Sequence, residues 1–223
     1  MDYEIMMNGN VRIGMQAPEF EASTTMGDIK LSDYKGKWVV LFSCPGAFLP
    51  TCTTEMIAFA NANTYFDERN ATLIGLSVDS NASHLAWAYD IYMKTGIRIP
   101  FPIIADGNGV IARKYGMISP DISNTEAIRN VVIIDDKGVV RTVLEYPKST
   151  GRFIPEIIRI IDSLQISDTE EVSTPANWFP GSLVVNIPPQ TFDELIERAN
   201  YLEMNNNALD WYLVFEERNK KLE

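Results

Sequence analysis

Cysteine and histidine are scarce in this sequence: its 223 residues include two cysteines and a single histidine, His84. Two cysteines are too few for the disulfide framework of a small secreted domain, so a reducing compartment such as the cytoplasm fits better. A structural zinc site takes four ligands at short paired spacings, which this inventory does not supply. His84 lies in a helical pattern, so we expect a structural histidine and not the base of a Cys-His hydrolase.

Basic residues are also few, because 19 Lys and Arg stand against 30 Asp and Glu and the net charge is −11. An acidic chain without a basic cluster repels phosphate backbones, which argues against nucleic acid as a partner. No apolar run approaches the ~18 residues of a membrane span, and the acidic N-terminus lacks the pattern of a secretory signal. Glycine-rich nucleotide motifs are missing as well. We therefore expect a cytoplasmic protein without membrane contact or a nucleotide cofactor.

Runs rich in valine and isoleucine alternate with helical patterns along most of the chain. The strands are predicted at residues 37–43, 71–78, 101–106 and 130–147, the last with a hairpin turn at Asp136-Lys137-Gly138. The helices are predicted at residues 52–69, 81–94, 108–115 and 152–165. This alternation, closed by a hairpin and a helix, predicts an α/β fold with a central mixed sheet flanked by helices.

The composition changes at residues 167–175, SDTEEVSTP, which are polar, acidic and typical of a linker. We therefore predict two domains, residues 1–166 and residues 167–223. The second holds a short strand at LVVNI and a helix from about Thr191 to Met204, where Thr191 and Glu194 form a capping-box pattern. So small an α+β extension needs another surface to pack on, either the first domain or a second subunit.

Both cysteines lie in one stretch, CPGAFLPTCTTE (44–55), directly after a strongly apolar strand. The loop between them contains prolines and a glycine, and a helix is expected from Pro50 or Thr51, which places Cys52 in its first turn. Unpaired N–H groups and the positive end of the helix dipole favour a thiolate there, the form that reacts with metals, disulfides or peroxides. The alternative is that Cys44 and Cys52 are small buried apolar residues, as free cysteines commonly are.

The residues around Cys52 resemble those of the peroxiredoxins, which are thiol peroxidases on a thioredoxin-like fold. The resemblance rests first on GKWVVLF followed by P-x-x-F-x-P-x-C-T-T-E, at residues 36–42 and 45–55. It extends over nearly the whole chain in the motifs APEF, LSDYKGKWVVLF, GLSVDS, HLAW, FPIIAD, RNVVIIDDKGVVR, TGR, IIRIIDSLQ and TPANWFPG. These motifs look like the one-cysteine subclass that is common among archaea. The resemblance implies a thioredoxin-like domain at residues 1–166 and a dimerisation domain at residues 167–223.

The resemblance also implies roles for single residues. Cys52 resembles the peroxidatic cysteine, whose thiolate attacks the O–O bond of a peroxide and becomes a sulfenic acid. Pro45 resembles the proline that shields the pocket from water. Arg129 resembles the arginine that holds thiolate and peroxide, and Arg152 resembles a second arginine near the pocket. A fixed cation beside a helix N-terminus would lower the pKa of the thiol and stabilise the leaving oxygen.

Further implications concern supporting residues and partners. Glu55 and Trp87 resemble residues that support the active site, and the chemistry requires no cofactor and no metal. The substrate would be hydrogen peroxide or an organic hydroperoxide, and the reductant an unidentified thiol. The assembly would be a homodimer with exchanged C-terminal tails, or a ring of five or six such dimers.

Two positions depart from the family pattern P-x-x-x-T/S-x-x-C. Leu49 stands at the Thr/Ser position and can donate no hydrogen bond to a thiolate or a peroxide; losing one such donor typically costs ~10²–10³ in rate. Thr51 and Thr53 point elsewhere in a helical turn and are not obvious replacements. Cys44 stands where the subclass usually has histidine, a position that faces the peroxidatic sulfur.

Three functions therefore remain open. The first, which we favour, is a working thiol peroxidase that Leu49 slows. The second is a redox sensor or disulfide switch, in which Cys44 resolves the sulfenic acid of Cys52 as an intramolecular disulfide; here the alternative is that Cys44 only fills apolar space. The third is a non-catalytic relative retained for assembly or chaperone-like binding.

Overall fold

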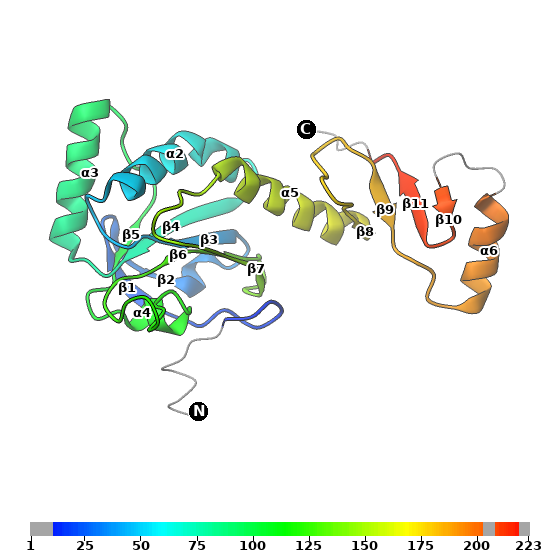
Figure 1. Cartoon of the computed structure of the whole chain (residues 1–223), viewed down its shortest axis with the longest axis horizontal. Helices are drawn as coiled ribbons and strands as arrows, with labels where there is room; N and C mark the ends of the chain where they lie inside the picture. The colour runs from blue at the N-terminus through cyan, green and yellow to red at the C-terminus, as the bar shows by residue number, and fades with distance from the viewer. Residues whose placement is uncertain (1–10, 203–207, 219–223) are drawn as a thin grey trace, which may run out of the picture. The chain divides into compact units, whose positions relative to one another are not determined.

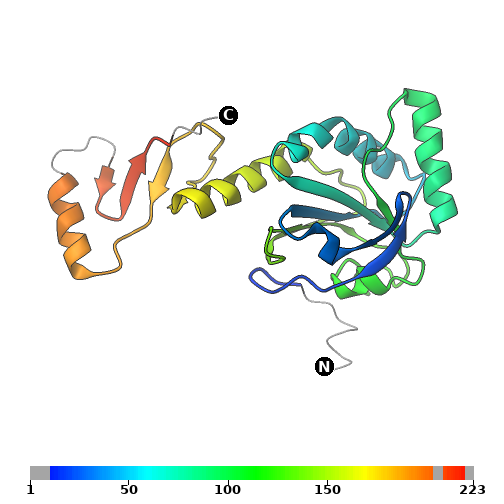
Figure 2. The ribbon, with the colours of Figure 1, turned by 180° about the vertical axis from the view of Figure 1, so that it is seen from behind.

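The computed structural model describes residues 11–202 and 208–218. The chain divides into two compact units, with the boundary between Ile154 and Pro155. The first unit contains both cysteines and the larger sheet, and the second contains a smaller sheet (Figures 1 and 2). No helix in the described ranges is long and apolar enough to cross a membrane.

The first unit is built on a seven-stranded sheet with the order β2-β1-β5-β4-β3-β6-β7. Its strands are β1 (Glu21–Thr24), β2 (Gly27–Lys30), β3 (Trp38–Ser43), β4 (Ala71–Ser77), β5 (Ile103–Ala105), β6 (Arg129–Ile134) and β7 (Val140–Tyr146). Strands β3, β4 and β5 run parallel, whereas β6 is antiparallel to β3 and β1 is antiparallel to β5. The prediction of a mixed sheet with a β6–β7 hairpin is confirmed.

Helices cover both faces of this sheet. They are α2 (Pro50–Asp67), α3 (Asn81–Thr95) and α4 (Val110–Lys114), with a short 3₁₀ helix η1 (Leu31–Tyr34) after β2. Helices α2 and α4 lie on opposite faces (Figure 1). Because successive strand residues point to opposite faces, β3 serves two cores. Val39 and Leu41 join the cluster that contains Ala112 of α4, whereas Phe42 stacks on Phe59 of α2 with 4.1 Å between ring centroids.

The strand order brings distant parts of the sequence to one edge of the sheet. Strand β3 ends at Ser43, and the antiparallel strand β6 begins at Arg129, so the start of β6 lies at the carboxyl end of β3. The Ser43 hydroxyl donates to the carbonyl of Ile128 (2.6 Å) and accepts from the amide of Asn130 (3.0 Å). These two bonds fix Arg129 beside the segment that follows β3.

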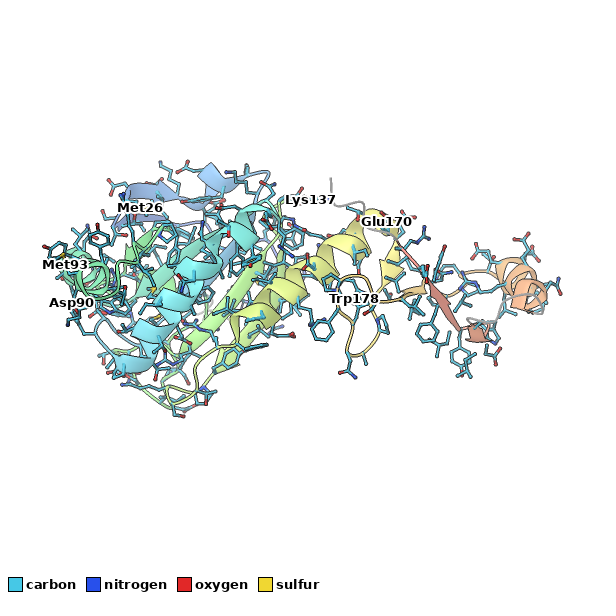
Figure 3. The ribbon with its side chains drawn as sticks, turned by 90° about the horizontal axis from the view of Figure 1, so that it is seen from above. Met26, Asp90, Met93, Lys137, Glu170 and Trp178 are labelled. Carbon is cyan, nitrogen blue, oxygen red and sulfur yellow. The ribbon has the colours of Figure 1, made fainter. Side chains whose placement is uncertain are left out.

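The second unit is a small α+β arrangement, as predicted. It comprises α5 (Ile154–Glu170), which begins at the boundary, β8 (Val172–Ser173), β9 (Val184–Asn186), α6 (Phe192–Leu202), β10 (Ala208–Asp210) and β11 (Leu213–Glu216). The sheet order is β10-β11-β9-β8. Its buried apolar cluster consists of Ile166, Val172, Trp178 and Val184. Trp178 lies beside α5 (Figure 3), and its carbonyl accepts a hydrogen bond from Arg159 at 3.2 Å.

Several local predictions need correction. Residues 167–170, predicted as linker, continue α5, and the compact units meet between residues 154 and 155 and not after residue 166. The capping-box prediction for α6 is confirmed: the Thr191 hydroxyl accepts from the amide of Glu194 at 3.2 Å, and the Glu194 carboxylate accepts from the backbone amide of Thr191 as well as from that of Gln190 (2.7 Å). The predicted end of this helix at Met204 lies outside the described residues.

The stacked pair Phe42–Phe59 gives a first test of the packing. Phe59 is fully buried, so Phe59→Ala should lower the free energy of unfolding by about 3–5 kcal/mol through lost burial and the cavity left behind. Tyr65→Ala, on the same helix but 54% exposed, should change it by less than about 0.5 kcal/mol. Urea denaturation followed by tryptophan fluorescence measures both, and equal losses in the two variants would contradict the packing described.

Candidate functional site around Cys52

The segment after β3 carries the first cysteine into the interior. Cys44 is fully buried, and its amide donates to the carbonyl of Leu76 on β4 at 2.8 Å. Pro45 is also buried, whereas Phe48 is 53% exposed and has a φ of 60°. A bulky residue with positive φ is a backbone outlier. The loop between the cysteines is therefore anchored at Cys44 and strained near its end.

Helix α2 begins directly after this loop and places the second cysteine in its first turn, as predicted. The N-cap residue is Leu49, which provides no side-chain hydrogen bond, and Pro50 occupies the first helical position. Cys52 follows in that turn and is fully buried. Cys52 and Glu55 are three residues apart, so both side chains point from α2 in the same direction.

Three polar groups contact the sulfur of Cys52 and lower its pKa: the Cys44 thiol, the amide of Gly46 and the guanidinium of Arg129. The pKa of Cys52 is lowered to about 6, first because the Cys44 thiol donates a hydrogen bond to it. Burial acts in the opposite direction, and the amide of Gly46 and the guanidinium of Arg129 lower the pKa further. The Nη1 atom of Arg129 lies 3.2 Å from Cys52 Sγ. Cys52 is therefore the thiolate of the pair at neutral pH.

Cys44 is the neutral partner. Its pKa is raised well above the ordinary value, first by its hydrogen bond to Cys52 and then by burial, while the charge of Arg152 acts in the opposite direction. The Nη2 atom of Arg152 lies 3.6 Å from Cys44 Sγ. The two sulfurs thus share one proton between two guanidinium groups.

Glu55 joins these two guanidinium groups in the protein interior. Its carboxylate accepts from Nη1 of Arg129 at 2.6 Å and from Nη2 of Arg152 at 2.8 Å. The amide and Nε of Arg152 also donate to it, at 2.9 and 2.8 Å. All three side chains are at most 2% exposed. A buried ion network of this kind is stable only when its charges and donors are matched.

Arg152 lies just before α5 and is the most heavily bonded member of the network. Its Nη1 donates to the carbonyls of Ser43 (3.0 Å) and Asn130 (3.1 Å), at the ends of β3 and β6. Its guanidinium carbon also lies 5.2 Å from the ring centroid of Phe42 and 5.5 Å from that of Phe59. Cation–π contacts at these distances add to the stabilisation of the buried charge. Arg152 thereby ties both strand ends to Glu55 of α2.

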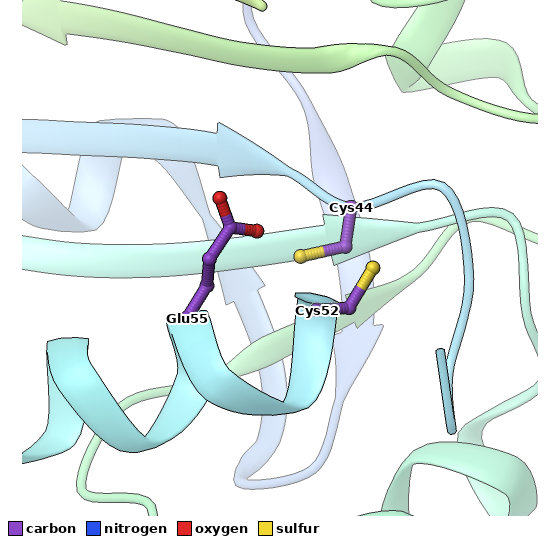
Figure 4. A group of neighbouring side chains, drawn as sticks. All are labelled: Cys44, Cys52 and Glu55. Carbon is purple, nitrogen blue, oxygen red and sulfur yellow. The ribbon is translucent and has the colours of Figure 1, made fainter. Parts of the chain in front are cut away.

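Cys44, Cys52 and Glu55 have donor atoms within 4.8 Å of one another, and Figure 4 shows the two sulfurs on the same side of the Glu55 carboxylate. Sulfur and carboxylate ligands can bind Zn²⁺. A metal ion here would, however, stand against two fixed guanidinium groups and compete with them for the Glu55 carboxylate. The charge of the surroundings therefore suits an anion at Cys52 and does not suit a metal.

The hydroxyl group of Thr53, which lies near Leu49, is engaged in two other hydrogen bonds. The Thr53 hydroxyl donates to the carbonyl of Leu49 (3.0 Å) and accepts from the indole N–H of Trp87 (3.0 Å). Trp87 thus supports the first turn of α2 from α3. Thr51 contributes its carbonyl to the hydroxyl of Thr54 at 2.7 Å. The expectation that Thr53 does not replace the missing hydroxyl agrees with these contacts.

His84 is a buried residue of α3, as expected for a structural histidine. Its Nε2 lies 2.6 Å from the hydroxyl of Ser77, and burial lowers its pKa. Ser77 also donates to Asp79 (2.7 Å), whose carboxylate accepts from the amide of Ala47 at 2.8 Å. No sequence pattern indicated this series of contacts, which attaches the loop between the cysteines to the end of β4.

Comparisons with known proteins agree on one family. The AhpC/TSA family profile matches residues 13–143. Peroxiredoxin 2 of Caldanaerobacter subterraneus is 57% identical over 92% of both chains, and the peroxiredoxin of Aquifex aeolicus is 49% identical over 91% of this chain and 95% of its own. The solved structure of the yeast mitochondrial 1-Cys peroxiredoxin aligns with a TM-score of 0.81 and 37% identity, covering 93% of this chain and 100% of its own. A variant of peroxiredoxin 6 of Arenicola marina aligns with a TM-score of 0.83 and 34% identity over 95% and 100%.

The buried network predicts a large effect of a small change. Glu55→Gln keeps the shape of the side chain but leaves two buried guanidinium groups without their shared carboxylate, so the free energy of unfolding should fall by about 3–5 kcal/mol. Glu156→Gln is the matched control, because Glu156 pairs with Arg159 at 2.6 Å but is 40% exposed, and it should cost less than about 1 kcal/mol. Urea denaturation measures the free energy of unfolding of both variants. A Glu55→Gln protein as stable as the Glu156→Gln control would contradict a stabilising role of the Glu55 carboxylate.

Proposed function

We propose that Cys52 is the peroxidatic cysteine of this chain, which belongs to the AhpC/TSA family and is a thiol-dependent peroxidase of the one-cysteine peroxiredoxin type. The observation that carries the proposal is the 3.2 Å contact between Arg129 Nη1 and the sulfur of Cys52. No other described cysteine has its pKa lowered. A thiolate is the reactive form of cysteine, so this sulfur is the nucleophile.

The reaction follows from the charges around that sulfur. The thiolate attacks one oxygen of the peroxide, the S–O bond forms as the O–O bond breaks, and Cys52 becomes a sulfenic acid. The other oxygen leaves as hydroxide or alkoxide and takes up a proton to give water or an alcohol. Arg129 is placed to stabilise the negative charge as it moves from sulfur to the leaving oxygen. Glu55 holds Arg129 in that position and acts as a positioning residue.

The remaining predicted residues have supporting roles in this proposal. Pro45 is buried next to Cys44 and helps to exclude water from the two sulfurs. Arg152 holds Glu55 and neutralises part of the charge near Cys44. The family implies a peroxide as substrate and a thiol as reductant. Because the sulfur of Cys52 has no exposed surface, the peroxide reaches it only when the loop between the cysteines opens.

Leu49 slows the chemical step in this proposal. It is the N-cap of α2 and offers no donor to the thiolate or the peroxide. The Cys44 thiol supplies one hydrogen bond to Cys52, but a thiol is a weak donor. A hydroxyl at residue 49 would add the missing transition-state hydrogen bond.

The second unit supports the proposal of a homodimer with exchanged C-terminal tails, or of a ring of such dimers. Its buried cluster is small, and its described surface carries several exposed apolar side chains: Phe179, Ile187, Phe192, Ile196, Leu209 and Tyr212. So many exposed large apolar side chains on a unit with so small a core favour burial against another chain. A cytoplasmic location is part of the same proposal, because both cysteines are free thiols.

Peroxide consumption with a thiol reductant in excess tests the catalytic assignment. Cys52→Ser should abolish the activity, since no other thiolate is present. Leu49→Thr should raise the rate of the peroxide step by about 10-fold or more, because one preorganised donor is commonly worth ~10²–10³. Leu49→Val is the control for a change of side-chain volume and should not raise it.

Activity that survives Cys52→Ser would refute the assignment of the nucleophile. A wild-type protein and a Leu49→Thr variant that are both inactive would favour the non-catalytic assembly function.

Light scattering after size-exclusion chromatography tests the assembly. The wild type should be a dimer or a multiple of it. Phe192→Asp combined with Leu209→Asp, at positions 75% and 74% exposed, should shift it to monomer because each charge would be buried in the exchanged interface. Tyr65→Asp, 54% exposed on α2, is the control and should leave the dimer intact. A monomeric wild type would contradict the proposal.

A further inference from the structure

We propose that Cys44 is the resolving thiol of this peroxidase and forms an intramolecular disulfide with oxidised Cys52. This inference rests on the proposed role of Cys52 and adds the second half of the reaction cycle. It would allow one subunit to complete both the oxidation of Cys52 and the formation of the disulfide with two neighbouring buried side chains. The external thiol would then reduce a disulfide and not a sulfenic acid.

The distance between the sulfurs is the first argument. Both side chains are fully buried, and their Sγ atoms lie within 4.8 Å of each other. Figure 4 shows the two sulfurs next to each other, Cys44 reaching from the end of β3 and Cys52 from the start of α2. A disulfide requires ~2.05 Å, so an approach of at most about 3 Å is sufficient.

The first turn of α2 is the part that can supply this movement. Cys44 is anchored to β4 through its amide, but Leu49 gives the helix no side-chain cap and Pro50 has no N–H. A missing N-cap lowers helix stability by ~1 kcal/mol. The positive φ of Phe48 adds strain immediately before this turn. Cys52 therefore sits in a helical turn that has no side-chain cap, opposite a Cys44 that is anchored to β4.

Oxidation of Cys52 changes the charges around Cys44 so that the thiolate form of Cys44 is favoured. In the reduced protein the Cys44 thiol stays protonated, chiefly because it donates to the Cys52 thiolate. A sulfenic acid carries no negative charge, so oxidation removes this cause, while Arg152 remains 3.6 Å from Cys44 Sγ and favours its thiolate. Oxidation of one sulfur thus activates the other.

The step balances without another reagent. The Cys44 sulfur attacks the sulfenic sulfur of Cys52, the S–S bond forms, and the S–O bond breaks. The leaving hydroxide takes the proton that Cys44 releases and departs as water. Cys44 is oxidised and the sulfenic sulfur is reduced, each by one electron equivalent, and the peroxide consumed in the first step is the source of the oxidation.

Mass spectrometry of the full-length protein after one molar equivalent of hydrogen peroxide tests the proposal. After acid quenching and alkylation of free thiols, the wild type should have lost two hydrogens and should take up no alkyl group. Digestion should yield a Cys44–Cys52 linked peptide that disappears on reduction. In Cys44→Ser the same treatment should leave a sulfenic acid at Cys52, trapped as a dimedone adduct. Cys44→Ala provides a second variant should the serine hydroxyl disturb the pocket.

The outcomes separate this inference from the proposed function. Sulfenic or sulfinic acid at Cys52 with Cys44 fully alkylated, or a disulfide between two subunits, would refute the resolving role and leave the peroxidatic role standing. A wild type in which Cys52 is not oxidised at all would refute both. Cys52→Ser is the matched control, and its Cys44 should remain fully alkylated because no sulfenic acid forms beside it.

Discussion

The burial of one carboxylate between two guanidinium groups is the constraint on which the site depends. Arg129 and Arg152 bring two positive charges into the interior, and Glu55 supplies one negative charge between them. A single uncompensated positive charge remains, and Cys52 lies 3.2 Å from the guanidinium that carries it. Burying an unpaired charge costs several kcal/mol. The group therefore becomes neutral overall when Cys52 is a thiolate, and the same balance that stabilises the fold favours the reactive form of the sulfur.

This arrangement explains why the ends of several elements converge at one point. Cys44 follows β3, Cys52 and Glu55 start α2, Arg129 starts β6, and Arg152 precedes α5. Each of these residues lies at the end of a strand or a helix. At such ends some backbone groups have no partner within the element and must be bonded from outside it. Arg152 bonds the carbonyls at the ends of β3 and β6 and the carboxylate of α2 together. Leu49 is the exception, because it leaves the N-terminus of α2 uncapped where a hydroxyl would both cap the helix and assist the reaction.

The pattern of apolar residues, prolines and glycines along the sequence predicted those parts of the fold that depend on a few consecutive residues. The Val- and Ile-rich runs became β3, β4, β6 and β7, and the proline-bounded loop placed Cys52 in the first turn of α2. Strands β1 and β2 were missed because EAST and GDIK are short and polar and are strands only through pairing with each other and with β5. Residues 167–170 are polar yet helical because they extend α5, which a search for linkers does not detect.

The site was less predictable from local pattern, because its contacts join residues far apart in the sequence. Arg129 and Arg152 lie 74 and 97 residues from the carboxylate that they share, and only the resemblance to a family pointed to them. The contact of Asp79 with the loop at Ala47 had no sequence signal at all.

The ionisation of Cys52 tests the central claim most directly. Titration of the thiolate by its ultraviolet absorbance, with Cys52→Ser subtracted as a blank, should give an apparent pKa of about 6. The thiolate, and with it the reaction with peroxide, should be present above that pH and be lost as the pH falls through it. In the wild type Cys44 should stay protonated through this transition, because its thiol donates a hydrogen bond to the Cys52 thiolate. A Cys52 that titrates near the free value of ~8.5 would contradict the account.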